Sequence, residues 1–420
     1  MMNVTIVIKW ERVQIFMGEA SRTMAGESAQ PSLLLGIGFG LLSSLGPLAI
    51  DLYLPAMPGM AREMAADSGA VQRTLSAFFL GLALAQIPLG TLGDRFGRRW
   101  PLIGGLILFI LASTACALAT SLEQLIVFRF LQGMGACAGT SSVRAMIRDR
   151  HSGHRAAQLM AFTFLVIGIS PVLAPLAGSY LLQLTSWRGL FGLLAGGGLI
   201  AILAVLLFLR ETLPPERRQA RQSMLRSYGD LLATPAFIGW TLVAGLATTI
   251  PFAFVTAAPF IFSLGFALSA HEYSLLLALN AGTSIIATQF APGLMKRLGA
   301  RRLVLTVATI ALVATAAIAL AAMKQPVALP LFQLYSMLLF AIAGLILTPA
   351  AISALDAAAG GAGAAAGLLG TLQLAITALA SGIVSLLPSL SILPLVSVLG
   401  GAFAIMWVTA GLIGPRQARA

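Results

Sequence analysis

The chain has 420 residues, of which 58% are hydrophobic and only 10% are charged, and its mean hydropathy is +0.94. This composition leaves too few polar residues to cover a soluble globule, so it excludes a soluble fold and favours a membrane protein. The net charge of +12 does not indicate nucleic-acid binding, because the basic residues lie in short loops rather than along one face.

Twelve apolar segments follow one another along the chain, each near the length of about 20 residues that an α-helix needs to cross a bilayer. They lack the period-two alternation of barrel strands, and only helices then satisfy the backbone in lipid. We therefore predict an all-α integral membrane protein with twelve transmembrane helices. The predicted helices are 32–56, 70–91, 101–119, 122–144, 156–183, 189–209, 235–262, 273–294, 303–322, 327–350, 360–386 and 391–413.

The basic residues predict how these helices are oriented. Of the 26 Lys and Arg residues, 21 lie in the two terminal tails and in alternate loops, whereas the intervening loops hold only four. By the positive-inside rule, we expect both termini to be cytoplasmic. Residues 1–31 lack the order of a secretory signal, so we expect cytoplasmic tails at 1–31 and 414–420.

The longest polar connector, residues 210–234, divides six predicted helices from six and is expected to be a cytoplasmic linker. We therefore expect an N-terminal six-helix bundle at 32–209 and a C-terminal one at 235–413. An offset of 204 residues aligns the two halves at several positions, such as Pro47 with Pro251. A fixed offset of this kind indicates an internal repeat.

The same offset reveals a difference between the halves. Asp51 aligns with Val255 and Arg129 aligns with Gln333, so both charges of the first half are neutral in the second. Asp51 is the only acid that we place well inside a predicted helix. Charges are costly in a membrane unless they face water or a counter-ion. Since the two residues lie at similar depth, a pair across the interior is feasible, and we expect them to act together. The alternative for Arg129 is that it reaches to the outer interface.

The loop between the second and third helices reads GTLGDRFGRR over residues 90–99. Here Gly90 is expected to permit close approach of another helix, Gly97 a tight turn, and Asp94 a pair with nearby arginines or a helix N-terminus. Such a cluster can latch the two bundles together on the cytoplasmic side; the alternative is an ordinary basic loop. A decayed copy follows the eighth helix, with Lys296 in place of Asp94. The predicted gate comprises Gly90, Asp94, Arg95, Gly97, Arg98 and Arg99.

This loop resembles the GxLxDRxGRR loop of the major facilitator superfamily, and Arg129-x-x-Gln132-Gly133-x-Gly135 resembles the RxxQGxG pattern of that family. Residues 46–55, GPLAIDLYLP, resemble the first helix of Bcr/CflA-type drug exporters, and this resemblance extends over residues 33–413. It includes the antiporter motif of the fifth helix, of which Pro175 and Gly178 carry over. Alanines at 174 and 177 replace the other two glycines of that motif.

The resemblance implies the major facilitator fold of two pseudo-symmetric six-helix bundles. It also implies export of small lipophilic drugs in exchange for protons, with Asp51 and Arg129 in proton coupling and substrate binding. The alternative function is proton-coupled export of a metabolite such as an amino acid or sugar. A membrane-embedded enzyme lacks support, because no His/Asp/Glu/Cys cluster suggests catalysis or a metal site. We expect a monomer that binds substrate, protons and lipid, without cofactor, metal or nucleic acid. The candidate cavity-lining residues are Tyr53, Gln132, Phe252, Phe254, Gln333 and Gln373.

Overall fold

The computed structural model describes residues 33–151, 153–214, 216, 228–358, 362–387 and 391–413, so the predicted tails lie outside it, as do residues 215 and 217–227 of the linker. The first half contains α2 (Leu33–Asp51), η1 (Leu54–Ala56), α3 (Met57–Glu63), α4 (Ser68–Phe96), α5 (Arg99–Leu118), α6 (Leu122–Arg150), α7 (Gly153–Leu181) and α8 (Trp187–Phe208). The second contains α10 (Pro235–Phe260), the π-helical turn η3 (Ile261–Gly265), α11 (Ala270–Leu298), α12 (Ala300–Lys324), α13 (Leu329–Ala357), α14 (Ala362–Ser385) and α15 (Ile392–Leu412).

The first span is not the continuous helix 32–56 that hydropathy predicts. α2 ends at Asp51, and the chain continues through η1 into α3, which ends at Glu63. Proline has no N–H, so Pro55 cannot donate the helical hydrogen bond to the carbonyl of Asp51. Asp51 therefore lies at a helix break, and further from the end of the span than the sequence suggests.

Eleven helical spans of the described chain are long and apolar enough to cross a membrane. The remaining long helix is α6, which carries Arg129, Gln132 and several glycines. It packs against α2, α4 and α5, so most of its surface faces protein rather than lipid. With α6, the prediction of twelve membrane helices is confirmed.

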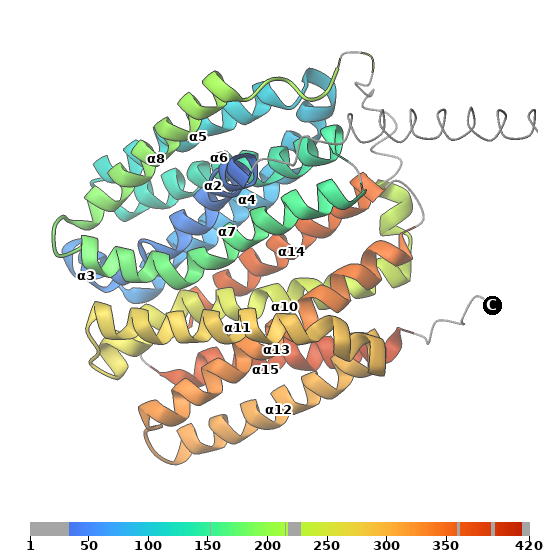
Figure 1. The fold of residues 1–420 in the computed structure, drawn as a ribbon. Coiled ribbons are helices and arrows are strands. Elements are labelled where there is room, and N and C mark those ends of the chain that lie inside the picture. The colour runs from blue at the N-terminus through green and yellow to red at the C-terminus, as the bar shows by residue number, and fades with distance from the viewer. Residues whose placement is uncertain are drawn as a thin grey trace, which may run out of the picture.

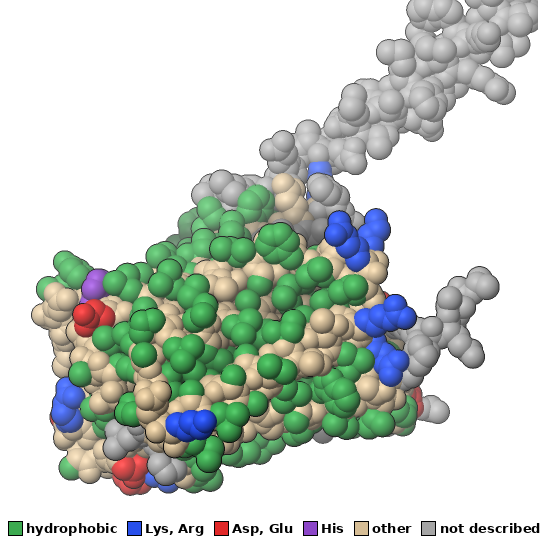
Figure 2. Space-filling view, turned by 90° about the horizontal axis from the view of Figure 1, so that it is seen from below, with side chains coloured by type: hydrophobic (Ala, Val, Ile, Leu, Met, Phe, Trp, Pro, Cys, Tyr) green, Lys and Arg blue, Asp and Glu red, His purple; other side chains and the backbone are tan. Residues whose placement is uncertain are grey.

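The helices form two groups, α2–α8 and α10–α15, which lie beside each other in Figure 1. The groups meet mainly where α4 packs along α14 and α7 along α11. Hydrophobic side chains cover the broad face seen in Figure 2, and Lys and Arg gather at one end of it. We call the end that carries Arg98, Arg99, Arg301 and Arg302 the basic end.

Backbone geometry shows the internal repeat directly. Four described residues have positive φ: Ala65 (48°), Gly97 (90°), Ala267 (54°) and Gly299 (76°). They form two pairs, each separated by 202 residues. Each pair marks the same turn in the two halves, after the first span and after the second. The second pair includes Gly97, where a tight turn was predicted.

Two glycines bring α4 and α6 into close contact. A Cβ on Gly133 would overlap with the carbonyl oxygen of Phe78, and one on Gly81 with that of Phe130. Small residues at a helix crossing allow the backbones to approach closely, which is how membrane helices associate. Gly133 of the predicted pattern therefore fixes the distance between α4 and α6, the helix that carries Arg129.

Candidate functional site

Arg129 is completely buried in the middle of the first half. Its Nη1 atom donates hydrogen bonds to the backbone oxygen of Ala49 (2.9 Å) and to Oε1 of Gln132 (2.6 Å). Gln132 in turn donates through Nε2 to Oγ of Ser113 (2.8 Å). The helical i, i+3 spacing of Arg129 and Gln132 produces this contact. The guanidinium is thus anchored inside the bundle and does not reach the interface.

Aromatic rings enclose the rest of the guanidinium. Its central carbon lies 4.4 Å from the ring centre of Tyr53, 4.5 Å from that of Phe78 and 5.7 Å from that of Phe191. Ring faces attract a cation, most strongly where water is excluded. Nε and Nη2 have no hydrogen-bond acceptor among the described residues. Cation–π contacts therefore replace a counter-ion in this arrangement, which we call the aromatic box.

Asp51 is 5% exposed and is the only acid among the buried residues of the described chain. It forms no ion pair with Arg129 here, and the described residues offer it no hydrogen bond. The fully buried hydroxyl of Tyr273 likewise has no partner in the described chain, and it lies within electrostatic range of Asp51. Tyr273 belongs to the second half and was not predicted. A lone tyrosine near a helix start gives no recognisable signal.

The predicted antiporter residues lie beside this acid. A Cβ on Gly178 would overlap with the carbonyl oxygen of Leu52, the residue after Asp51. α7 consequently packs tightly against the end of α2. Pro175, one helical turn earlier, is buried. The motif thus brings the fifth membrane helix close to the acid.

In the second half, a neutral network occupies the position of Arg129. Gln333 donates through Nε2 to Oδ1 of Asn280 (2.9 Å), and Ser336 donates to the same oxygen (3.0 Å). The Nδ2 donor of Asn280 has no acceptor among the described residues. The predicted charge asymmetry between the halves is therefore also an asymmetry of hydrogen bonding.

The predicted aromatic and amide residues of the second half have different surroundings. Phe252 packs against Phe79 across the junction of the halves, with ring centres 4.9 Å apart and the rings tilted by 59°. Phe254 is fully buried within the second half, where it packs against Phe332 and two other phenylalanines. Gln373 is partly exposed. Of the two phenylalanines, Phe252 is thus the one that contacts the other half.

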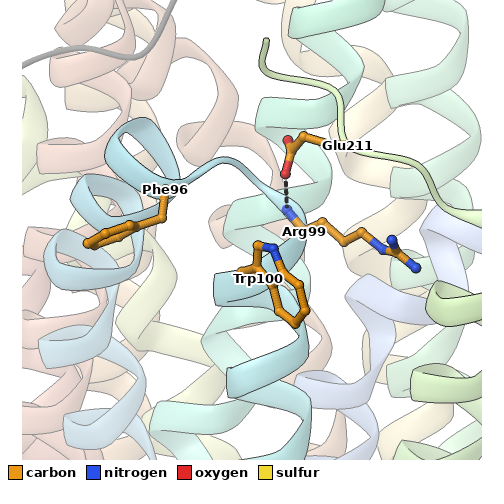
Figure 3. Close-up of a pocket in the computed structure, with 4 residues that line it drawn as sticks. All are labelled: Phe96, Arg99, Trp100 and Glu211. Carbon is orange, nitrogen blue, oxygen red and sulfur yellow. Dashed lines mark hydrogen bonds between the residues drawn. The ribbon is translucent and has the colours of Figure 1, made fainter. Parts of the chain in front are cut away.

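At the basic end, the loop motif surrounds a carboxylate that the sequence motif does not include. Glu211, three residues after α8, accepts hydrogen bonds from the backbone N–H groups of Arg98 (2.8 Å) and Arg99 (3.1 Å). A cavity of about 480 Å³ lies here, lined by Phe96, Arg99, Trp100 and Glu211 (Figure 3). The carboxylate occupies the N-terminus of α5, where unsatisfied N–H groups and the helix dipole favour an anion.

These donors control the charge of Glu211. Burial raises the pKa of its carboxyl, but backbone N–H donors of Leu213, Arg98, Arg99 and Thr212 outweigh that effect and lower the pKa below its usual value. The carboxylate is therefore held ionised at neutral pH.

Ion pairs complete the loop. Arg98 contacts Asp94 at 2.6 Å and Asp149, at the end of α6, at 2.9 Å. The predicted pairing of Asp94 with a nearby arginine is confirmed. Arg95 instead lies over the ring of Phe96, at 5.1 Å. All these partners belong to the first half, so in this conformation these contacts of the motif do not join the two bundles.

The two motif glycines differ. A Cβ on Gly97 would overlap with the Glu211 carboxylate, so this position needs glycine both for its positive φ and for space. A Cβ on Gly90 would have no described atom within 4 Å, so the expected close approach of another helix is absent here.

Comparison with known proteins identifies the family to which the sequence is similar. The sequence matches the Major Facilitator Superfamily over residues 39–381. It is 32% identical to the MFS-type transporter YdgK of Bacillus subtilis (strain 168) over 360 residues, which cover 84% of this chain and 89% of the relative. It is 31% identical to the multidrug resistance protein MdtL of Salmonella heidelberg (strain SL476) over 255 residues, 60% of this chain and 65% of that protein.

The fold is similar to the crystal structure of a D-xylose–proton symporter, with a TM-score of 0.70 at 14% identity over 91% of this chain and 97% of that one. At this identity the likeness shows the fold alone. Together with the family match, it agrees with the twelve-helix arrangement. The chain belongs to the major facilitator superfamily and is a membrane transporter, not an enzyme.

Proposed function

We propose that the chain is a Bcr/CflA-type antiporter, which exports small lipophilic compounds from the cytoplasm in exchange for protons. The observation that carries this proposal is Asp51, a buried acid at a helix break with no ion-pair partner among the described residues. An acid in such a place can gain and lose a proton during a cycle, because no fixed cation holds it ionised. The multidrug name of the relative MdtL supports the lipophilic substrate class.

Coupling requires that the proton changes how the halves meet. Asp51 belongs to the first half, and the unpartnered hydroxyl of Tyr273 belongs to the second. An ionised Asp51 attracts this hydroxyl more strongly than a neutral one. In the proposed cycle, substrate enters from the cytoplasm while Asp51 is ionised, and the transporter opens outward. Substrate leaves at the periplasmic side, and a proton neutralises Asp51 before the transporter returns. Rocking of the two bundles provides alternating access.

The proposal also covers the oligomeric state, the membrane, the orientation and the bounds of the bundles. The protein is a monomer in the bacterial inner membrane, with both termini and the linker 210–234 in the cytoplasm. The bundles comprise 32–209 and 235–413. The basic end seen in Figure 2 supports this orientation, because the positive-inside rule places such residues in the cytoplasm.

A second candidate is export of a polar metabolite by the same mechanism. The network of Gln333, Asn280 and Ser336 favours it, because the free Nδ2 donor of Asn280 suits a hydroxyl or carbonyl of a solute. A lipophilic drug offers fewer such groups. A susceptibility panel in a strain that lacks its own efflux pumps distinguishes the two substrate classes.

The test of proton coupling uses purified protein in liposomes with an imposed pH difference and ethidium as probe. Asp51→Asn should abolish pH-driven ethidium movement, whereas Asp51→Glu should retain part of it. Asp230→Asn makes the same chemical change at an exposed acid and should transport normally. Full pH-driven transport by a well-folded Asp51→Asn variant would contradict the assignment.

A further inference from the structure

A cavity of about 780 Å³ lies at the basic end of the second half, remote in sequence from Asp51 and Arg129. Most of its lining is apolar, and Leu298 and Leu412 at its edge are exposed, so it opens at the protein surface. The polar lining includes Arg301, Arg302 and Ser353. Nothing in the proposed transport cycle uses this cavity.

The cavity is the repeat counterpart of the one that Glu211 occupies. Under the 202-residue offset of the turn glycines, Phe96, Arg99 and Trp100 of the first cavity correspond to Leu298, Arg301 and Arg302 of the second.

The arginines at the equivalent position also bond alike. Arg99 donates to the backbone oxygen of Leu206 in α8 (3.0 Å), and Arg301 donates to those of Ala410 (3.0 Å) and Gly411 (2.7 Å) at the end of α15. The two halves thus build the same frame around each cavity.

The described lining of the second cavity includes no carboxylate, whereas Glu211 lines the first. Under the 202-residue offset Lys296 stands in place of Asp94. Under the 204-residue offset that aligns Arg129 with Gln333 in the same pair of helices, Ser353 stands in place of Asp149. The backbone N–H groups of Ala300 and Arg301, equivalent to those that Glu211 binds, have no acceptor among the described residues. Among the described residues, the second cavity therefore keeps the donors and cations, but no acidic side chain lines it.

Two polar side chains in the cavity wall also lack hydrogen-bond partners among the described residues. Ser353 is 4% exposed and Trp240 is 6% exposed, and both line the cavity. Neither the serine hydroxyl nor the indole N–H makes a hydrogen bond with a described residue. Neither atom is among the fully buried unpartnered atoms of the described chain, so solvent reaches both, and in the cavity wall they are available to a ligand that accepts hydrogen bonds.

We propose that this cavity binds the phosphate headgroup of an anionic phospholipid from the leaflet at the basic end. The phosphate takes the place that the Glu211 carboxylate has in the first half, at the N-terminus of α12 and beside Arg302. The apolar lining and the exposed leucines at the mouth suit an acyl chain. These features select a lipid rather than a free phosphate ion.

The experiment measures lipid binding to the purified full-length protein by native mass spectrometry. Phosphatidylglycerol is titrated against phosphatidylcholine with the same acyl chains, and phosphatidylglycerol should bind about tenfold more tightly. Ser353→Asp restores a carboxylate and should abolish this preference. Its matched control, Ser353→Asn, has nearly the same shape without the charge and should keep it.

If Ser353→Asp does not fold, a second pair of variants tests whether the cavity binds phosphatidylglycerol. Arg302→Gln should weaken phosphatidylglycerol binding several-fold. Lys296→Gln removes the same charge from an exposed residue that does not line the cavity, and should have little effect. Equal binding of both lipids, or equal losses in Arg302→Gln and Lys296→Gln, overturns the proposal.

Two further arms identify the source of the anion. Inorganic phosphate at millimolar concentration should not displace the lipid; displacement would show a site for free phosphate instead. Deletion of 414–420 should leave lipid binding unchanged. If lipid binds only after that deletion, the following segment of the chain is the occupant, and the lipid proposal is wrong.

Discussion

The two halves of this transporter surround different polar groups with the same helix framework. In the first half, a buried cation lies in an aromatic box formed by Tyr53, Phe78 and Phe191. In the second, Gln333 at the repeat position joins a neutral amide and hydroxyl network. The two repeats thus share one helix arrangement but carry different buried polar side chains. This is possible because the helix crossings depend on small residues rather than on the polar ones.

The largest expected effect comes from forcing the chemistry of the first half onto the second. Gln333→Arg places a cation beside Asn280 and Ser336, without the box. An unpaired charge inside a membrane costs at least about 2.5 kcal/mol. We expect a large fall in melting temperature in detergent and loss of inserted protein. Gln333→Leu, which removes only hydrogen bonds, should cost about 1 kcal/mol. Equal melting of Gln333→Arg and the wild type would show that the second half can also hold a cation.

The second comparison concerns the crossings themselves. Gly133→Ala should push α4 and α6 apart, because its Cβ would overlap with the Phe78 carbonyl. In the second half, a Cβ on Gly344 would lie 2.6 Å from the Ser284 carbonyl, a milder conflict. Overpacking typically costs about 1–3 kcal/mol, so Gly133→Ala should lower the melting temperature more than Gly344→Ala does.

Transport should separate the same variants. Gly133→Ala distorts the aromatic box and should impair efflux, whereas Gly104→Ala, with nothing within 4 Å, serves as a control near wild type. A Gly133→Ala variant with normal melting and efflux would mean that the crossing adjusts freely.

How far the sequence predicted this site depends on the kind of signal each residue carries. Arg129 and Asp51 stand out because charges are rare in membrane helices. Phe78 and Phe191 do not, since an apolar residue in an apolar helix looks like any other lipid-facing or packing residue. Asp149 and Glu211 lie 62 residues apart, and their shared loop is visible only once the helices are assembled.

Helix ends show a similar limit. The prediction ended the fourth membrane helix at 144, whereas α6 continues to Arg150. Hydropathy detects where a helix leaves the apolar layer, but the backbone hydrogen bonds continue into the charged region. The break after Asp51 was recognisable in principle from Pro55, because a proline removes one helical donor.

The third comparison uses the turn glycines. Gly97→Ala and Gly299→Ala both place a side chain at positive φ, which costs about 1 kcal/mol. Only at Gly97 does the new Cβ also displace a carboxylate, that of Glu211. We therefore expect Gly97→Ala to lower the melting temperature more than Gly299→Ala, by the loss of charge-assisted hydrogen bonds. Equal effects of the two changes would show that Glu211 contributes nothing to stability.

The smallest expected effect is the pH dependence of that same carboxylate. The pKa of Glu211 is lower in the folded protein, because the backbone donors that outweigh burial favour its charged form. A group with a lowered folded pKa stabilises the protein above its unfolded pKa of about 4.3, and this contribution is lost as the pH falls through the folded value.

Glu211→Gln should therefore melt slightly below the wild type at pH 7, with a cost under about 2 kcal/mol, since Glu211 is partly exposed and solvent weakens the interaction. The gap between the two proteins should close as the pH falls from the unfolded pKa of about 4.3 through the lower folded pKa of Glu211. Other acids titrate in both proteins alike, so the difference isolates Glu211. Glu216→Gln makes the same change at an exposed carboxylate and should show no such gap. A gap that stays constant as the pH falls through that range would mean that the shape of the side chain, not its charge, seals the first cavity.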